Sequence, residues 1–220
     1  KKAQISFGKS QTIEFDKGTL NYFTGKPGKI LTEVLLECFR KLILACNYPI
    51  IYISTKDREE VIFRKLLELW NIGPQVNEPI KKNRIIKKFI AEYGTMTLEN
   101  SIHIVYVNDI ERLKDIIFKD KWECIFIDNL SQLKRNQNDY REIEKYETIY
   151  LLKEYAANKM ININIADYLF EDIDVSDIVS CPLYLNKIAE IVNEIFFIDK
   201  NKKQNDFEES ILNKINIKSF

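Results

Sequence analysis

Residues 24–39 read TGKPGKILTEVLLECF, and this stretch joins a loop with two glycines and two lysines to the start of a helix. The run TLNYFT before it (19–24) is rich in residues that favour strands. After the loop, apolar residues recur at steps of three and four: Ile30, Leu31, Val34, Leu35, Cys38, Phe39, Leu42 and Ile43. This period is typical of a helix with a buried face. The sequence therefore predicts a strand, a short loop and a buried helix in succession.

Strand and helix patterns alternate along the rest of the chain. Continuous apolar runs predict strands at YPIIYIS (48–54), IHIVYV (102–107) and WECIFID (122–128), and MININIA (160–166) alternates as a strand does. Helical spacing predicts helices at 57–70, 80–94, 109–119 and 139–159, the first with Asp57 as its N-cap. Two later apolar runs, 177–185 and 188–199, are expected to be strands that form a hairpin.

This order of elements predicts an α/β fold. Strands that alternate with helices form a mostly parallel sheet flanked by helices, and the late hairpin adds antiparallel strands at the C-terminal edge. We expect one domain over residues 1–200. Residues 201–220 are expected to be a tail that ends in a short helix packed on the domain. With only 6 glycines and 5 prolines in 220 residues, an all-β protein with many turns is disfavoured.

The composition is that of a folded globular protein, since 45% of the residues are hydrophobic. Lys and Arg number 33, as do Asp and Glu, so the net charge of zero indicates neither an acidic nor a basic partner. No apolar run approaches the length of roughly 20 residues that spans a membrane. We therefore expect no membrane partner and a cytoplasmic location.

The cysteines and the one histidine do not predict a metal site. Cys38, Cys46, Cys124 and Cys181 are scattered, with no Cys-x-x-Cys pair, and His103 has no cysteine at metal-ligand spacing. Most of the cysteines lie in apolar stretches and are expected to be small core residues. His103 lies within SIHIVYV and is expected to be a strand residue.

Two of the predicted strands end in residues that suggest phosphate chemistry. In an open parallel sheet, ligands bind beyond the carboxyl ends of the strands. Residues 24–32 follow the first strand, and Asp128 ends WECIFID. A phosphate loop followed later by an apolar strand that ends in Asp is the Walker A and Walker B layout of P-loop NTPases.

With these two ends in place, the chain resembles the RecA-type ATPase domain of DnaB-type replicative helicases. Three further segments carry the likeness in the same order: YISTKDREEVIFRKLLEL (52–69), ECIFIDNLSQLKR (123–135) and LLKEYAANKMININIADYL (151–169). The resemblance implies a RecA-like fold, ATP and Mg²⁺ as cofactors, and a role in DNA replication or recombination. It also implies DNA, further copies of the chain, or a helicase or other replication protein as partners.

The loop departs from the pattern of this family. In the register that keeps the helix aligned, Ile30 replaces the last glycine, Leu31 replaces the lysine and Thr32 keeps the Mg²⁺-binding hydroxyl. A second register places Gly28 and Lys29 at the Gly-Lys pair, but then Ile30 replaces the hydroxyl. The candidate nucleotide-binding residues are Gly25, Lys26, Gly28, Lys29, Thr32 and Asp128, and Asp128 would hold Mg²⁺ if nucleotide binds.

Other positions that the family uses for catalysis also differ. Lys56 falls where the family has its catalytic glutamate, and a protonated lysine cannot act as a base. Asp167 or Tyr168 falls where the family has a glutamine that senses the γ-phosphate. The basic run of the family is not reproduced, although Lys200, Lys202 and Lys203 supply charge. We assign no catalytic residue and expect ATP hydrolysis to be impaired or absent.

A basic segment offers a second candidate site, and two other functions stay open. The lysines and arginine of the predicted helix 80–94 either contact a nucleic-acid backbone or form a solvated helix face: Lys81, Lys82, Arg84, Lys87 and Lys88. One alternative function is an active ATP-dependent helicase motor that uses Lys29 and Asp128. The other is a relative in fold alone that serves as a protein-interaction module.

Overall fold

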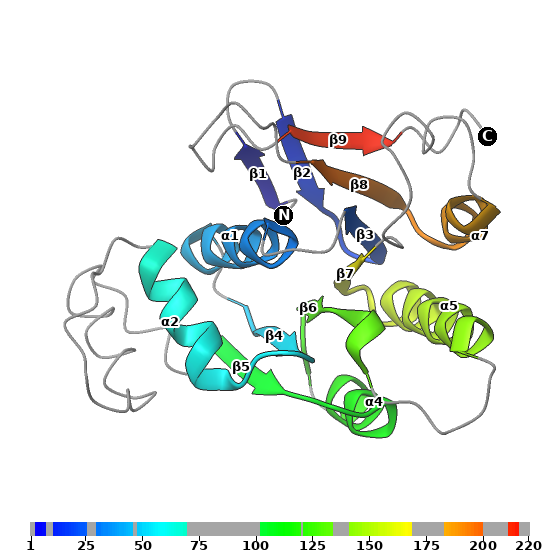
Figure 1. Cartoon of the computed structure of the whole chain (residues 1–220), viewed down its shortest axis with the longest axis horizontal. Helices are drawn as coiled ribbons and strands as arrows, with labels where there is room; N and C mark the ends of the chain where they lie inside the picture. Colours follow the sequence, from blue (N-terminus) through cyan, green and yellow to red (C-terminus); the bar gives the residue numbers. More distant parts are fainter. Residues whose placement is uncertain are drawn as a thin grey trace.

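The computed structural model describes residues 3–7, 11–25, 30–45, 48–69, 102–119, 121–133, 141–168, 183–199 and 211–215. Its centre is a seven-stranded sheet in the order β5-β4-β6-β7-β3-β8-β9 (Figure 1). The strands are β3 (Thr19–Gly25), β4 (Ile50–Ser54), β5 (Ile102–Tyr106), β6 (Cys124–Asp128), β7 (Asn162–Tyr168), β8 (Glu194–Asp199) and β9 (Ile211–Ile215). All pairings are parallel except that of β8 with β9.

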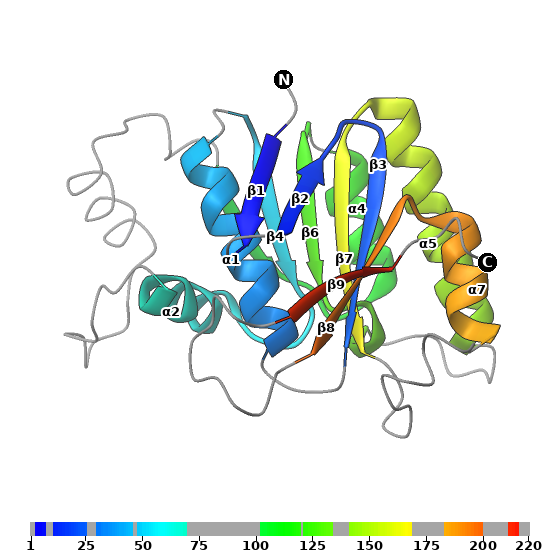
Figure 2. The ribbon, with the colours of Figure 1, turned by 90° about the horizontal axis from the view of Figure 1, so that it is seen from above.

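Helices cover both faces of this sheet (Figures 1 and 2). One face packs against α1 (Ile30–Ala45) and α2 (Glu59–Leu69), and the other against α4 (Ile110–Lys119), α5 (Arg141–Lys159) and α7 (Leu183–Ile191). A separate hairpin of β1 (Ala3–Phe7) and β2 (Gln11–Phe15) lies on the α1 side. The mostly parallel α/β fold predicted from the sequence is confirmed.

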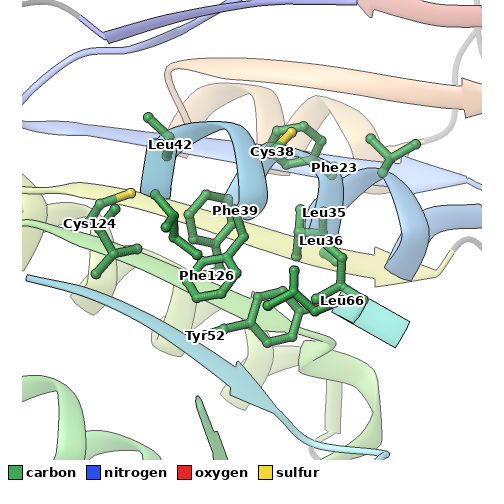
Figure 3. Packing of buried hydrophobic residues seen from close by; sticks show 14 of the residues in the cluster. Phe23, Leu35, Leu36, Cys38, Phe39, Leu42, Tyr52, Leu66, Cys124 and Phe126 are labelled. Carbon is green, nitrogen blue, oxygen red and sulfur yellow. The ribbon is translucent and has the colours of Figure 1, made fainter. Parts of the chain in front are cut away.

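The core on the α1 face is aromatic at its centre. Phe39 of α1 packs edge-on against Tyr52 of β4 and Phe126 of β6, with ring centroids 5.3 and 5.7 Å apart (Figure 3). Phe15 of β2 reaches the same Phe126 ring at 6.1 Å. Every residue of β4 and β6 is buried, as their continuous apolar runs predicted.

The C-terminal part of the prediction was wrong in its details. Where the structure describes the predicted hairpin of 177–185 and 188–199, Leu183–Ile191 is helix α7 and only Glu194–Asp199 is a strand. Ile188, Ile191 and Val192 fall at helical spacing and pack into the core on the α5 side. Short apolar runs of this kind fit either structure, and the tertiary contacts decide between them.

The antiparallel edge exists, with β8 inside the predicted run 188–199, but its partner strand comes from elsewhere in the chain. Ile211–Ile215, within the tail expected to be helical, is strand β9 and pairs with β8. This pairing satisfies the backbone groups that the outer edge of β8 would otherwise expose. The hairpin β1–β2 was not predicted at all, although Ile13 and Phe15 alternate with polar residues and are buried.

The predicted cap of the second helix was also wrong. Helix α2 begins at Glu59, and the carbonyl of Arg58 accepts hydrogen bonds from the backbone N–H groups of Val61 and Ile62. Asp57 instead donates its N–H to Ser54 Oγ.

The predicted helix 80–94 lies outside the described residues. Among the helices that are described, none has the length and apolar character needed to cross a membrane.

Candidate functional site

The two sequence segments that suggested phosphate chemistry meet at one edge of the sheet. Because the strands are parallel, Gly25, Ser54, Asp128 and Tyr168 all lie at their carboxyl ends, with Ser54 paired to Asp128 and Gly25 paired to Tyr168. Helix α1 follows β3 and begins at Ile30, so its first turn lies at this edge. The topology therefore places Thr32 of α1 near the end of β6.

Thr32 and Asp128 are in direct contact. The Thr32 hydroxyl donates a hydrogen bond of 3.2 Å to Oδ1 of Asp128, and the two residues are only 5% and 4% exposed. Leu31 is fully buried in the core beneath α1, and Ile30 packs beside that core. Of the two registers considered for the loop, the one that ends on Thr32 is therefore the one that brings a hydroxyl to Asp128.

Tyr52 takes the second oxygen of the same carboxylate. Its hydroxyl donates a hydrogen bond of 2.7 Å to Oδ2 of Asp128. The Tyr52 ring packs against the rings of both Phe39 and Phe126, which fixes the direction of the hydroxyl (Figure 3). In the sequence, Tyr52 looked like an ordinary apolar strand residue. The available signal was that a buried tyrosine hydroxyl needs a polar partner.

Burial governs the ionisation of this pair. It raises the pKa of Asp128, while the hydrogen bonds from Tyr52 and Thr32 and the charge of Lys65 act in the opposite direction. Burial also raises the pKa of Tyr52 well above its ordinary value, and the negative charge and the hydrogen bond of Asp128 add to this effect. In both groups, burial therefore acts against the charged form.

Tyr168 closes the other side of Thr32. It is half-buried, it packs against the α1 core, and its hydroxyl interacts with the side chains of Thr32 and Asn129. Burial, followed by the negative charge of Asp128, raises its pKa, and the two polar contacts lower it. The Thr32 hydroxyl therefore lies between a carboxylate and a phenol.

Of the two residues considered for the γ-phosphate position, only Tyr168 faces this cluster. Asp167 points to the opposite face of the sheet and is fully buried. There Asp167 Oδ2 accepts a hydrogen bond of 2.7 Å from Tyr22 and forms an ion pair with Lys145 of α5. Asp167 is thus part of the internal packing of the domain.

Two neighbouring charged residues after β4, Lys56 and Asp57, have different surroundings. Lys56 is exposed, whereas the next residue, Asp57, is partly buried and pairs with Lys65 at 2.6 Å. The charge of Asp57 raises the pKa values of Asp128, Tyr52 and Tyr168, so it lies within electrostatic reach of the cluster. Asp57 was not predicted to be a site residue.

The packing of the sheet explains why residue 25 is a glycine. A Cβ at this position would lie 2.6 Å from the carbonyl oxygen of Ile198 in β8, closer than real contacts allow. Lys26, Gly28 and Lys29 lie outside the described residues, as do the basic residues Lys81, Lys82, Arg84, Lys87 and Lys88 and the later Lys200, Lys202 and Lys203. Their roles remain predictions.

Solved structures share this architecture. A DnaB-like replicative helicase, solved in a study of its interactions with primase, matches over 91% of this chain and 55% of its own, with a TM-score of 0.62 and 11% identity. The chain has the fold of a DnaB-like helicase ATPase domain. A second solved structure, itself an isolated ATPase domain, matches over 91% of this chain and 81% of its own, again with a TM-score of 0.62 and 11% identity.

The likeness is one of fold, and it covers only part of the larger relative. The chain spans about half the length of the DnaB-like helicase chain that it matches. No protein-family model and no curated protein matches the sequence. The RecA-like fold that the sequence motifs implied is nevertheless confirmed.

The residues present do not fit the Mg²⁺ that this fold implies. Thr32 and Asp128 are the residue types that hold the ion in P-loop proteins. Mg²⁺ demands octahedral oxygen ligands and usually keeps several of its waters. Here each Asp128 oxygen accepts a hydroxyl hydrogen bond, the residue is buried, and burial raises the pKa of its carboxyl group. The pair is built as an internal hydrogen-bonded contact.

Proposed function

We propose that the chain is a P-loop-type domain of the DnaB-like helicase fold that acts as a binding or assembly component in DNA replication or recombination. ATP hydrolysis in this domain is impaired or absent. The observation that supports the proposal is the placement of Leu31 in the core, next to a Thr32–Asp128 pair that survives. A buried leucine offers no positive charge to a β- or γ-phosphate.

The fold can stay stable without ATP hydrolysis for a physical reason. Thr32 and Asp128 join α1 to β6, and Leu31 adds apolar contacts at the same place. Residues at the positions where the family binds nucleotide thus contribute to packing, and a domain that does not turn over ATP keeps its architecture. A fold of this kind supports many functions, so the role in DNA transactions rests on the relatives of the chain.

Steady-state ATP hydrolysis tests the proposal most directly. We expect turnover at the level of a protein-free blank, both with and without single-stranded DNA. ATP turnover that is stimulated by DNA and abolished by Asp128→Asn would establish the alternative, an active motor. The Thr32–Asp128 contact is the observation that favours this alternative.

A titration with single-stranded DNA separates the proposal from a protein-interaction module. We expect affinity that falls as salt rises, since phosphate contacts release counterions. Replacement of Lys81, Lys82, Arg84, Lys87 and Lys88 by glutamine asks whether the predicted basic helix contributes. Loss of all DNA binding in the unmodified chain would favour the protein-interaction module.

A further inference from the structure

The Thr32–Asp128 pair belongs to a larger polar cluster. Tyr52 donates to one oxygen of Asp128, Thr32 donates to the other, and Tyr168 interacts with Thr32. The four residues come from β4, α1, β6 and β7, so the cluster connects one helix to three strands. We define these four residues as the hydroxyl cluster.

The surroundings of the hydroxyl cluster keep its members in place. Aromatic packing holds the Tyr52 ring, and Leu31 fills the space beneath the first turn of α1. Beside the cluster, Asn129 N–H donates to Thr55 Oγ1 at 3.0 Å, and Thr55 N–H donates to the Asp128 carbonyl at 2.7 Å. The ends of β4 and β6 are thus joined by main chain and side chain together.

We propose that the hydroxyl cluster holds α1 against β4, β6 and β7 without any ligand, and that it does not take Mg²⁺. In P-loop proteins the equivalent hydroxyl and carboxylate hold a magnesium-bound nucleotide. In this chain the hydroxyl of Tyr52 donates to one oxygen of Asp128 and that of Thr32 to the other, so an ion at this carboxylate would have to compete with two buried hydrogen bonds. The inference deepens the proposed function, on which it rests for the location of the nucleotide site.

Thermal unfolding of the full chain tests the exclusion of Mg²⁺. The unfolding midpoint is measured with ADP and Mg²⁺, with ADP and EDTA, and with Mg²⁺ alone. We expect the same midpoint under all three conditions, or an equal shift with ADP whether or not Mg²⁺ is present. A stabilisation by ADP that requires Mg²⁺ and disappears in Asp128→Asn overturns the inference.

Single-atom variants test the ligand-free connection. Tyr52→Phe keeps the ring and removes the hydroxyl, and we expect its midpoint to fall by roughly 3–10 °C. Tyr168→Phe is expected to lower it less, because that side chain is only half-buried. Tyr150→Phe is the matched control, since Tyr150 is 55% exposed on α5 and its loss of a hydroxyl should leave the midpoint unchanged.

A double-mutant cycle identifies the partner of Tyr52. If its hydroxyl acts through Asp128, the effects of Tyr52→Phe and Asp128→Asn are clearly non-additive.

The inference is overturned, even if Mg²⁺ has no effect, when the unfolding midpoints of Tyr52→Phe and Tyr168→Phe match that of the Tyr150→Phe control. If Tyr52→Phe does not fold, Tyr168→Phe and the Mg²⁺ comparison still decide.

The two proposals can fail separately. Suppose that DNA stimulates ATP turnover while the unfolding midpoint is the same in Mg²⁺ and in EDTA. This result overturns the proposed function and leaves the inference about the hydroxyl cluster in place. Stabilisation by ADP that depends on Mg²⁺, without turnover, overturns the inference and leaves the proposed function.

Discussion

Gly25 lies so close to β8 that a Cβ on it would be 2.6 Å from the carbonyl oxygen of Ile198. The contact is with backbone, which cannot move without disturbing the pairing of β3 and β8. We expect Gly25→Ala to lower the free energy of unfolding by about 1–3 kcal/mol, as overpacking does. Urea unfolding followed by circular dichroism measures this.

Gly18 provides the control for that variant. Its φ of 79° is left-handed, but a Cβ there meets nothing closer than 3.5 Å. Asn tolerates this conformation, so Gly18→Asn should cost less than about 1 kcal/mol. Equal losses for the two variants would mean that the sheet does not require glycine at position 25.

Asp128 is expected to be a major stabilising residue. Asp128→Ala leaves the buried hydroxyls of Tyr52 and Thr32 without their acceptor, so we expect a loss of about 2–4 kcal/mol in the free energy of unfolding. Asp115→Ala removes an exposed carboxylate that pairs with Lys119, and should cost less than about 1 kcal/mol. Chemical denaturation of both variants checks this, and similar losses would contradict it.

The raised pKa of Asp128 predicts a pH dependence. The folded state binds the proton more tightly than the unfolded chain, so ionisation of Asp128 costs stability. This cost is absent below the ordinary value of 3.8 and is complete above the raised pKa. The stability of the wild type relative to Asp128→Asn should therefore fall as pH rises through that window.

Urea unfolding of both proteins from about pH 4 to about pH 7 measures this difference. Subtracting one curve from the other removes the pH-dependent contributions that do not involve Asp128. A difference that stays constant, or that grows in favour of the wild type as pH rises, would show that the pKa is not raised.

Lys145 and Asp167 form a buried ion pair, so we expect the two charges to depend on each other. Lys145→Met removes the positive charge while Asp167 stays buried beside Tyr22, so we expect a loss of about 3–5 kcal/mol. Lys17→Met breaks a pair with Glu123 in which both side chains are substantially exposed, and should cost less than about 1 kcal/mol. Thermal and urea unfolding compare them, and a small effect of Lys145→Met would refute the coupling.

Three buried asparagines form a ladder across β3 and β7. Asn21 Nδ2 donates to Asn164 Oδ1 at 3.0 Å, and Asn164 Nδ2 donates to Asn162 Oδ1 at 2.6 Å. Asn164→Val deprives both neighbours of a partner, and we expect a loss of about 2–3 kcal/mol.

A second substitution tests that explanation. Asn21→Val combined with Asn164→Val removes an unsatisfied donor and should cost less than the sum of the two single variants. Denaturation curves of the three variants give the coupling. Strict additivity would mean that the amides do not act through one another.

Part of the candidate site followed from sequence alone. Thr32 and Asp128 were identified as a pair from their place in a resemblance, and the structure puts them in contact. Tyr52, Tyr168 and Asp57 complete the surroundings, but none was expected to lie against Asp128. Tyr52 is 76 residues from Asp128 in the chain, and the sequence around β4 does not indicate that β6 is the neighbouring strand.

The sequence by itself determined the order and type of most elements, because the spacing of apolar residues is a local property that each segment carries. It determined, for the same reason, that β4 and β6 are buried on both faces. Only the tertiary structure decided that Leu183–Ile191 is a helix and that Ile211–Ile215 is an edge strand. It alone also decided which polar groups meet across the sheet. Such contacts depend on strand order and register, and these are set by the packing of the whole domain.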